Sequence, residues 1–184
     1  MAPGDGIVLR PLAVDDGAGL ADAYARNRAH LAPWEPLRDE TYFSARQQDL
    51  LVARTLQDVA AGRSAAYVLV AESGRIAGRV NLSDIVRGVF LSAHLGYWID
   101  QSFAGRGHMR RAVAEVCALG RDRIGLHRIQ AATMLGNTAS QRVLTANGFT
   151  PIGTAERYLR IAGEWQDHLL FQRILEDTAT QAGP

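Results

Sequence analysis

The spacing of hydrophobic residues along the chain predicts where helices and strands lie. Over residues 14–31 and 45–62 these residues recur at helical spacing, which predicts two helices, the second ended by glycine. The apolar run at residues 6–12 predicts a short strand. Between the two helices, residues 32–43 are interrupted by two prolines, so we expect this segment to be largely loop.

The rest of the chain switches repeatedly between strand and helix patterns. Two apolar runs within residues 65–85 flank Ser73-Gly74, which predicts a hairpin. Helical spacing returns at residues 108–123 and 137–149. The remaining predicted strands cover residues 90–100, 127–134, 150–161 and 164–175. The predicted order of elements is therefore β-α-α-β-β-β-α-β-α-β-β.

This order predicts the fold class. Strand hairpins precede one β-α-β-α passage, a combination typical of a mixed sheet with helices on its faces. A chain of 184 residues, 47% of them hydrophobic, can build one domain with a sizeable core but hardly two. We therefore expect a single α/β domain of the α+β type over residues 1–184, with residues 1–5 and 177–184 frayed.

Charge and cysteine content exclude several classes of protein. The formal net charge is +1 and the sequence has no basic tail or stripe, so no nucleic-acid partner is expected. The N-terminus does not resemble a signal peptide, and no apolar run approaches the ~20 residues that cross a bilayer. We expect a cytoplasmic protein without a membrane partner. Cys117 is the only cysteine, and its place in a predicted helix predicts a buried apolar residue.

The segment WIDQSFAGRGHMRRAV, residues 98–113, places glycines where a predicted strand passes into a predicted helix. Gly105 and Gly107 would let the exposed N–H groups of the helix start approach an oxyanion closely. Arg106 and Arg110 add positive charge, so the loop suits a pyrophosphate; alternatively, the glycines only shape the turn. The dinucleotide-binding pattern is excluded because Arg110 stands where its third glycine belongs, and the Gly-Lys-Ser or Gly-Lys-Thr of a P-loop is absent.

A second polar pair stands at the start of the next predicted helix. Asn137 and Ser140 are three residues apart and share one face of its first turn. Alternatively, Asn137 only caps the helix and Ser140 is solvated. The glycine loop, this pair and a closing Asn-Gly-Phe follow one another within one β-α-β-α unit, an order that favours a shared binding site.

Together these features resemble the GCN5-related N-acetyltransferase (GNAT) superfamily, and more narrowly its branch of ribosomal-protein N-terminal acetyltransferases (RimJ/RimL-like). The superfamily loop Gln/Arg-x-x-Gly-x-Gly/Ala aligns with AGRGHM, where Gly107 matches the central glycine while Ala104 and Met109 depart from the pattern. Further similarity covers nearly the whole chain, in LAPWEP, LGYWID, NTASQRVLTANGF and GEWQDHLLF. The resemblance implies a mostly antiparallel sheet that is splayed where the donor binds.

The resemblance also implies acetyl-CoA as the donor, and no metal. The donor's pyrophosphate would bind the loop formed by Gly105, Arg106, Gly107, His108, Met109 and Arg110. Its pantetheine arm would run, like an extra strand, beside Tyr97, Trp98 and Ile99. Asn137 would bind near this arm, and a strand N–H would act as oxyanion donor. Ser140 would lie close to the sulfur and protonate or hydrogen-bond the leaving thiolate.

Candidates for the general base come from the C-terminal half of the chain. Glu156 lies on a strand that faces the cleft in branch relatives and would take the proton of the amine. Alternatively, it is a surface glutamate paired with Arg157 or Arg160. His94 and His168 are rival bases, although the sequence around His168 is typical of a structural strand with a satisfied histidine.

The proline-interrupted segment, residues 32–43, would form the acceptor pocket in relatives of this branch. Trp34 and Tyr42 would supply an apolar wall that excludes water and orients a short chain terminus. Alternatively, Trp34 only fills the core beneath the loop. Three acidic residues would attract a cationic amine, or are ordinary solvated charges: Glu35, Asp39 and Glu40.

The predicted function is transfer of an acetyl group from acetyl-CoA to a primary amine by direct attack. The leading acceptor is the α-amine of a protein or peptide. Direct attack needs no enzyme nucleophile, which agrees with an unreactive Cys117. Two alternatives stay open: transfer to a small-molecule amine (an amino acid, a polyamine or an amine antibiotic), and a non-catalytic acyl-CoA-binding module. The acyl group could also be longer or acidic, and a homodimer is implied by the resemblance alone.

Overall fold

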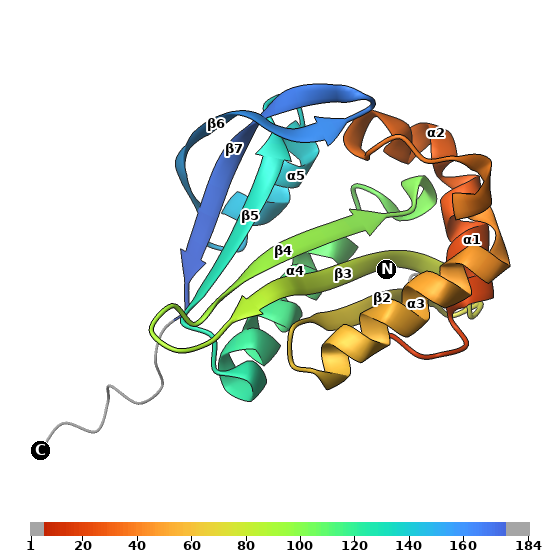
Figure 1. The fold of residues 1–184 in the computed structure, drawn as a ribbon, viewed down its shortest axis with the longest axis horizontal. Helices are drawn as coiled ribbons and strands as arrows, with labels where there is room; N and C mark the ends of the chain where they lie inside the picture. The colour runs from red at the N-terminus through yellow and green to blue at the C-terminus, as the bar shows by residue number, and fades with distance from the viewer. Residues whose placement is uncertain (1–5, 176–184) are drawn as a thin grey trace, which may run out of the picture.

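The computed structural model describes residues 6–175 (Figure 1). The frayed ends predicted at residues 1–5 and 177–184 lie outside the described residues. The strands are β1 (Ile7–Pro11), β2 (Ala65–Ala71), β3 (Ile76–Val86), β4 (Ser92–Ile99), β5 (Arg128–Met134), β6 (Thr150–Ile161) and β7 (Glu164–Ile174). The helices are α1 (Gly17–Arg26), α2 (Arg28–Leu31), α3 (Ala45–Ala60), α4 (His108–Leu119) and α5 (Thr138–Thr145). The predicted order of elements is confirmed except that the first predicted helix is divided into α1 and α2.

The seven strands form one sheet in the order β1-β2-β3-β4-β5-β7-β6. Among the described strands, only β4 and β5 pair in parallel, and the other neighbours are antiparallel. The parallel pair is joined through α4, because parallel neighbours need a crossover connection. The predicted fold class, one domain built on a mixed and mostly antiparallel sheet, is therefore confirmed.

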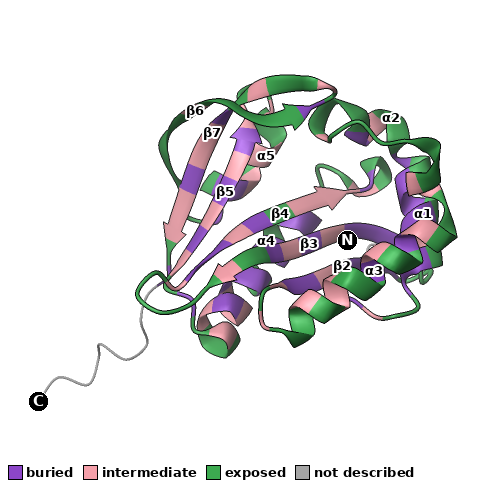
Figure 2. Cartoon of the chain, in the orientation of Figure 1, coloured by how far each residue is buried: buried purple, intermediate pink, exposed green. Residues whose placement is uncertain are grey.

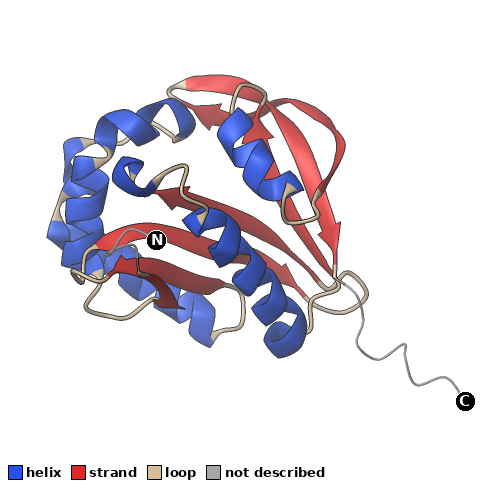
Figure 3. Cartoon of the chain, turned by 180° about the vertical axis from the view of Figure 1, so that it is seen from behind, coloured by secondary structure: helices blue, strands red, loops and turns tan. Residues whose placement is uncertain are grey.

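Helices cover both faces of the sheet, as predicted. On one face α4 and α5 pack on the central strands through residues such as Val113 and Leu144 (Figure 3). On the other face α1 and α3 cover β2 and β3, with Leu20 at the centre of a second cluster. Successive side chains of a strand point to opposite faces, so Leu69 of β2 belongs to the first cluster and Val68 to the second. By contrast, most of β6 is exposed (Figure 2).

The helix predicted over residues 14–31 is interrupted at Asn27, which separates α1 from α2. Asn27 is buried; its Nδ2 donates to the carbonyl of Ala23, and its Oδ1 accepts the N–H of Gln101, both at 2.9 Å. The interruption thus ties the helical layer to the segment that follows β4. Hydrophobic spacing continues through Asn27, so the sequence pattern does not reveal it.

The helix predicted over residues 108–123 also differs in its last turn. α4 ends at Leu119, and residues Gly120–Ile124 form a π-helical turn. No helix within residues 6–175 is long and apolar enough to cross a membrane.

Candidate active site

β4 and β5 diverge from each other, as predicted for a splayed sheet (Figure 1). They pair over only three residues of each strand, although both strands continue beyond that point. The N–H of Asp100, directly after β4, donates to the carbonyl of Ala77 at 2.8 Å. Because peptide groups alternate in direction along a strand, Tyr97 and Ile99 present their main-chain groups to the gap instead. β4 therefore offers free hydrogen-bonding groups where the sheet opens.

A cavity of about 180 Å³ lies at this opening. The side chain of Tyr97 reaches Ser140 of α5, whereas that of Trp98 reaches Tyr24 of α1 on the opposite face. Since Tyr97 and Trp98 both line the cavity, it passes through the sheet between β4 and β5. We call its two ends the α5 end and the α1 end. Its lining consists of Leu31, Trp34, Glu35, Leu95, Gly96, Tyr97, Trp98, Ala131, Ala132, Thr133, Met134, Asn137, Ser140, Leu144, Leu159, Ile161 and His168.

Asn137 and Ser140 come together at the α5 end. Asn137 is the N-cap of α5, and its Oδ1 accepts the backbone N–H of Ser140 at 3.1 Å. The hydroxyl of Tyr97 lies 2.8 Å from Ser140 Oγ and donates to the Ser140 carbonyl at 3.1 Å. Burial raises the pKa of Tyr97 to about 12, so its phenol keeps its proton near neutral pH. Asn137 thus both caps α5 and lines the cavity, and the phenol of Tyr97 holds Ser140 in position.

Thr133 of β5 adds a hydroxyl that the sequence analysis did not single out. It is 4% exposed, lines the cavity, and its Oγ1 has no hydrogen-bond partner among the described residues. Leaving a buried hydroxyl unpaired costs roughly 1–3 kcal/mol, a cost that a ligand bonded to it would offset. In the sequence Thr133 is an ordinary β-branched residue of a strand, which gives no signal of this role.

The loop before α4 has the backbone conformation that its glycines permit. Gly105 and Gly107 have φ angles of 76° and 81°, in the left-handed region that favours glycine. A Cβ at either position would meet nothing within 4 Å, so the space beside the loop is open. Gly107 occupies the N-cap position of α4, but as a glycine it has no side chain that could accept a hydrogen bond from the helix start. The first N–H groups of α4 lack partners within the helix and lie at its positive end.

The other residues predicted for this loop contribute in different ways. The side chains of His108 and Met109 are buried, and Nδ1 of His108 accepts from Arg111 at 2.7 Å. His108 and Met109 can therefore meet a ligand only through their main chain. Arg106 and Arg110 are exposed. The loop residues do not line the cavity but lie beyond β4, where the chain enters α4.

Asp100 fixes the start of this loop. Its carboxylate accepts the N–H and the hydroxyl of Ser102, at 2.8 Å and 2.6 Å, and lies 3.2 Å from the guanidinium of Arg26. Burial alone would raise the pKa of Asp100, but these hydrogen bonds lower it to about 2. The carboxylate therefore stays ionised at neutral pH and keeps the loop in place.

Aromatic side chains and one carboxylate form the α1 end. Trp98 Nε1 donates to the hydroxyl of Tyr24 at 2.9 Å, which fixes the indole. Trp34 is 39% exposed and lines the cavity; its role as an acceptor wall stays a prediction. Glu35 follows it and also lines the cavity. Tyr42 does not reach the cavity, because its ring packs edge-on against Tyr24 with centroids 5.1 Å apart.

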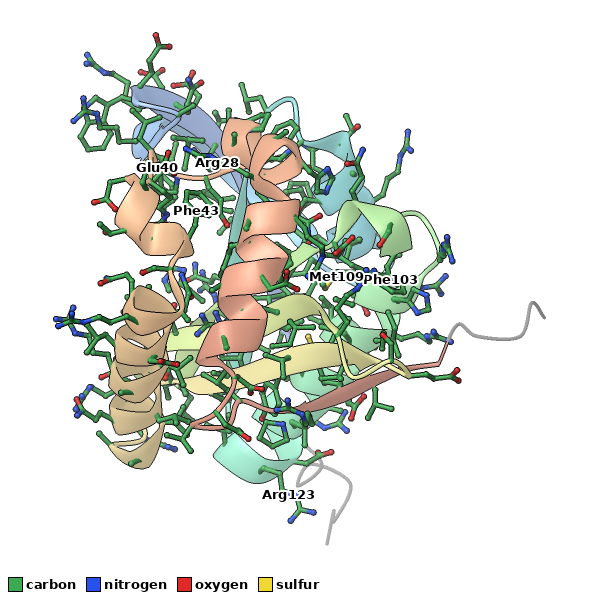
Figure 4. The ribbon with its side chains drawn as sticks, turned by 90° about the vertical axis from the view of Figure 1, so that its right-hand side faces the viewer. Arg28, Glu40, Phe43, Phe103, Met109 and Arg123 are labelled. Atoms are coloured by element: carbon green, nitrogen blue, oxygen red, sulfur yellow. The ribbon has the colours of Figure 1, made fainter. Side chains whose placement is uncertain are left out.

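A second cavity, also about 180 Å³, adjoins the α1 end and shares Leu31 and Glu35 with the first. Arg28 lies on its wall, where the guanidinium stacks on Phe43 and pairs with Glu40 (Figure 4). Glu40 itself lines neither cavity and is exposed.

The structure does not bring Glu156 to the cavity. The register of β6 with β7 shifts between Ala155 and Leu159, so that three residues stand opposite Asp167. Arg157 has a φ of 49°, and its N–H donates to Asp167 at 2.8 Å. Such a bulge changes which side chains face the sheet. Glu156 is exposed within it, while Leu159 lines the cavity.

Of the two histidines weighed as bases, His168 lines the cavity and His94 does not. His168 is 3% exposed, and its Nδ1 lies 2.9 Å from the carbonyl of Gln166. A carbonyl only accepts, so Nδ1 carries a proton and this one ring nitrogen is satisfied. Cys117 is buried too, and burial raises the pKa of its thiol. Within residues 6–175, no group of three or more His, Cys, Asp or Glu side chains could hold a metal ion.

Comparison with known proteins agrees with this geometry. The family model described as Acetyltransferase (GNAT) domain matches residues 7–150. The [ribosomal protein uS5]-alanine N-acetyltransferase of Escherichia coli (strain K12) is 37% identical over 170 residues, which cover 90% of this chain and 86% of the relative.

Two solved structures are similar over nearly the whole chain. The ribosomal-protein-S5-alanine acetyltransferase of Vibrio fischeri has a TM-score of 0.89 and 35% identity, covering 93% of this chain and 94% of that one. RimJ of Mycobacterium smegmatis, solved in complex with CoA-disulfide, has a TM-score of 0.88 and 28% identity, covering 99% of this chain and 86% of that one. The similarity therefore includes both the splayed strands and the segments at the α1 end.

Proposed function

Since this chain belongs to the GNAT family and is an acetyl-CoA-dependent N-acetyltransferase, we propose that its acceptor is the α-amine of a protein N-terminus, that of a ribosomal protein first. The observation that carries this proposal is the 37% identity, across 90% of the chain, to an enzyme that acetylates the alanine of ribosomal protein uS5. The resemblance noted from the sequence, both to the family and to its RimJ/RimL-like branch, is thereby confirmed.

Acetyl-CoA would be held largely by main-chain groups. The N–H groups of residues 105–110 would bind its pyrophosphate, helped by the charge of Arg106 and Arg110. Support comes from the open space beside Gly105 and Gly107. Its pantetheine arm would bond to the free edge of β4 at Tyr97 and Ile99, with the Asn137 amide and the unpaired Thr133 hydroxyl as further partners.

The thioester would then lie inside the cavity, between the two faces of the sheet. The amine attacks the thioester carbonyl, the N–C bond forms, the C–S bond breaks, and the attacking nitrogen releases a proton to water as the amide forms. A main-chain N–H of β4 that faces the gap would stabilise the oxyanion. Ser140 would donate a hydrogen bond to the departing thiolate when the phenol of Tyr97 donates to Ser140 Oγ, because the hydroxyl proton of Ser140 is then available. The thiolate finally takes a proton from water.

The amine would arrive from the α1 end. Trp34 and Trp98 supply an apolar wall that excludes water and orients a narrow chain terminus. Tyr42 supports this wall from behind through Tyr24. A role for Glu156 as general base stays a prediction, and its exposed place in the bulge offers it no support.

A cytoplasmic location would follow from a ribosomal-protein acceptor, because the N-terminus of such a protein is available where ribosomes are made. The predicted homodimer stays a prediction, because it came from the resemblance alone.

The test is an acetylation assay on the purified chain with acetyl-CoA. Acceptors should include peptides with the N-terminal sequence of the organism's own uS5, the same peptides with a blocked α-amine, and small amines such as spermidine. We expect thiol release and one added acetyl mass with the free peptide, and neither with the blocked one. Turnover confined to small amines would reject the proposed acceptor. Tight acetyl-CoA binding without turnover on any amine would instead favour the non-catalytic module.

A further inference from the structure

Glu35 stands at the opposite end of the cavity from Ser140. Among the described residues that line this cavity, it is the only carboxylate, and the same holds for the adjoining second cavity. Glu35 thus lies on the wall that the two cavities share. A cationic amine that entered from the α1 end would meet this negative charge before reaching the thioester.

The position of Glu35 is fixed by its main chain. Its carbonyl accepts the N–H of Ala162 at 3.0 Å, in the turn between β6 and β7. This bond joins residues 32–43 to the β6–β7 hairpin, whose tip lies beside α2 in Figure 1. The side chain is only 21% exposed, and its Oε2 lies 3.9 Å from Nε of Arg38. Glu35 is therefore a largely buried carboxylate with one weak ion pair.

We propose that Glu35 binds the α-ammonium group of the acceptor and takes up its proton, so that the neutral amine can attack the thioester. This inference rests on the proposed acetyl transfer to an α-amine. In the step, one N–H bond of the ammonium breaks and the proton passes to an Oε atom of Glu35. The freed lone pair forms the N–C bond and the thiolate leaves toward Ser140. As the amide forms, the attacking nitrogen loses a second proton to water, and Glu35 returns the first to water.

The electrostatic surroundings of Glu35 support this role. Burial raises its pKa, and the charge of Arg38 opposes this rise. A free glutamate has a pKa near ~4.3, and a base is more effective as its pKa approaches the working pH. Other titratable or charged groups lie around Glu35, on the linings of the two cavities and in the packed aromatic cluster. They are Arg28, Arg38, Tyr24, Tyr42, Tyr97 and His168.

His168 is the rival base at the same cavity. Phe171, three residues later on β7, packs in the cluster under α4 and α5, so His168 points to the opposite face. Its ring is 3% exposed and lies 5.5 Å from that of Tyr158. Its Nδ1 proton is held by the carbonyl of Gln166, so this nitrogen offers no lone pair to the proton of an amine. Glu35 supplies both the attraction and the proton acceptor.

The experiment compares Glu35→Gln with Glu164→Gln across pH. Glu164 is a matched control because it lies beside the β6–β7 turn that contacts Glu35, is exposed and lines neither cavity. At pH 7 we expect kcat/KM for the acceptor to fall about 10²–10⁴-fold in E35Q, with the KM for acetyl-CoA unchanged. The deficit should shrink above pH ~8, where a free α-amine is already deprotonated. E164Q should behave as the wild type. Thermal melting and acetyl-CoA binding check that both variants fold.

Two more variants keep the inference falsifiable. Arg38→Met removes the charge that lowers the pKa of Glu35, so the acidic limb of its pH–rate profile should move to higher pH. His168→Gln should keep that limb. The inference fails if E35Q keeps wild-type kinetics, or if the limb disappears in H168Q and persists in E35Q. All variants are assayed with whichever amine the wild type acetylates. The assay of the wild type alone therefore tests the peptide acceptor, and the variants test the role of Glu35.

Discussion

The two ends of the cavity are built in different ways. On the donor side, which comprises the α5 end and the loop before α4, most candidate binding groups are main-chain groups, namely the N–H groups before and within the first turn of α4 and the free edge of β4. At the α1 end they are side chains, among them Trp34 and Glu35. Main-chain groups stay the same under most substitutions, whereas side chains do not. The α5 end therefore suits a constant donor, and the α1 end is where acceptor choice would be decided.

Ser140 would break this comparison most directly, since it is, with Asn137 and Thr133, one of the side chains proposed to contact the donor at the α5 end. Ser140→Ala should lower kcat about 10²-fold, the loss typical of one hydrogen-bond donor to a developing negative charge. The Kd for acetyl-CoA should change little. Thr138→Ala, in the same turn but exposed and away from the cavity, is the control. Steady-state kinetics with calorimetric binding measures both; an unchanged kcat would remove Ser140 from the mechanism.

Gly107 tests the main-chain half of the comparison. Gly107→Ala would let the free loop relax from its left-handed conformation, which costs a residue with a Cβ about 1–2 kcal/mol. Binding must restore that conformation, so the Kd for acetyl-CoA should rise about 5–30-fold by calorimetry. Gly74→Ala is the matched control. Gly74 resembles Gly107 in its φ of 79° and its open surroundings, but it lies in the β2–β3 turn. Equal weakening in both variants would point to general destabilisation.

A smaller effect is expected at Tyr97. Tyr97→Phe removes the phenol that donates to Ser140, and one such hydrogen bond contributes about 0.5–1.5 kcal/mol. We expect kcat to fall about 2–13-fold. If Tyr97 acts through Ser140, the same substitution in the S140A background should have no further effect on kcat. Independent, additive losses in the double variant would contradict this positioning role.

The α5 end could be predicted closely from the sequence because it is nearly contiguous. The glycine loop, β5 and the Asn137–Ser140 pair follow one another along the chain, and their roles depend on local backbone rules for strand ends and helix starts. The splay of the sheet was implied by the family resemblance alone, and the order of the strands in the sheet is a finding of the structure. Thr133 was missed because a buried hydroxyl in a strand looks like an ordinary β-branched residue.

The α1 end could not be predicted in the same way. It joins residues 31–35 to residues 159–168, and nothing local in either segment states that they meet. β6 is exposed along most of its length, so no alternation of apolar residues marks which side chains face the sheet. The bulge opposite Asp167 then shifts that facing, which separates Glu156 from the cavity. The carboxylate that does line the cavity, Glu35, was only one of three loop acids in the sequence.

A passage that is lined from both faces of the sheet gives the two substrates separate entrances. Neither has to leave before the other arrives, so transfer occurs within a complex of enzyme, thioester and amine. Inhibition by the products should reveal this arrangement. Free CoA should compete with acetyl-CoA for the α5 entrance but not with the amine, and the acetylated peptide should show the reverse pattern.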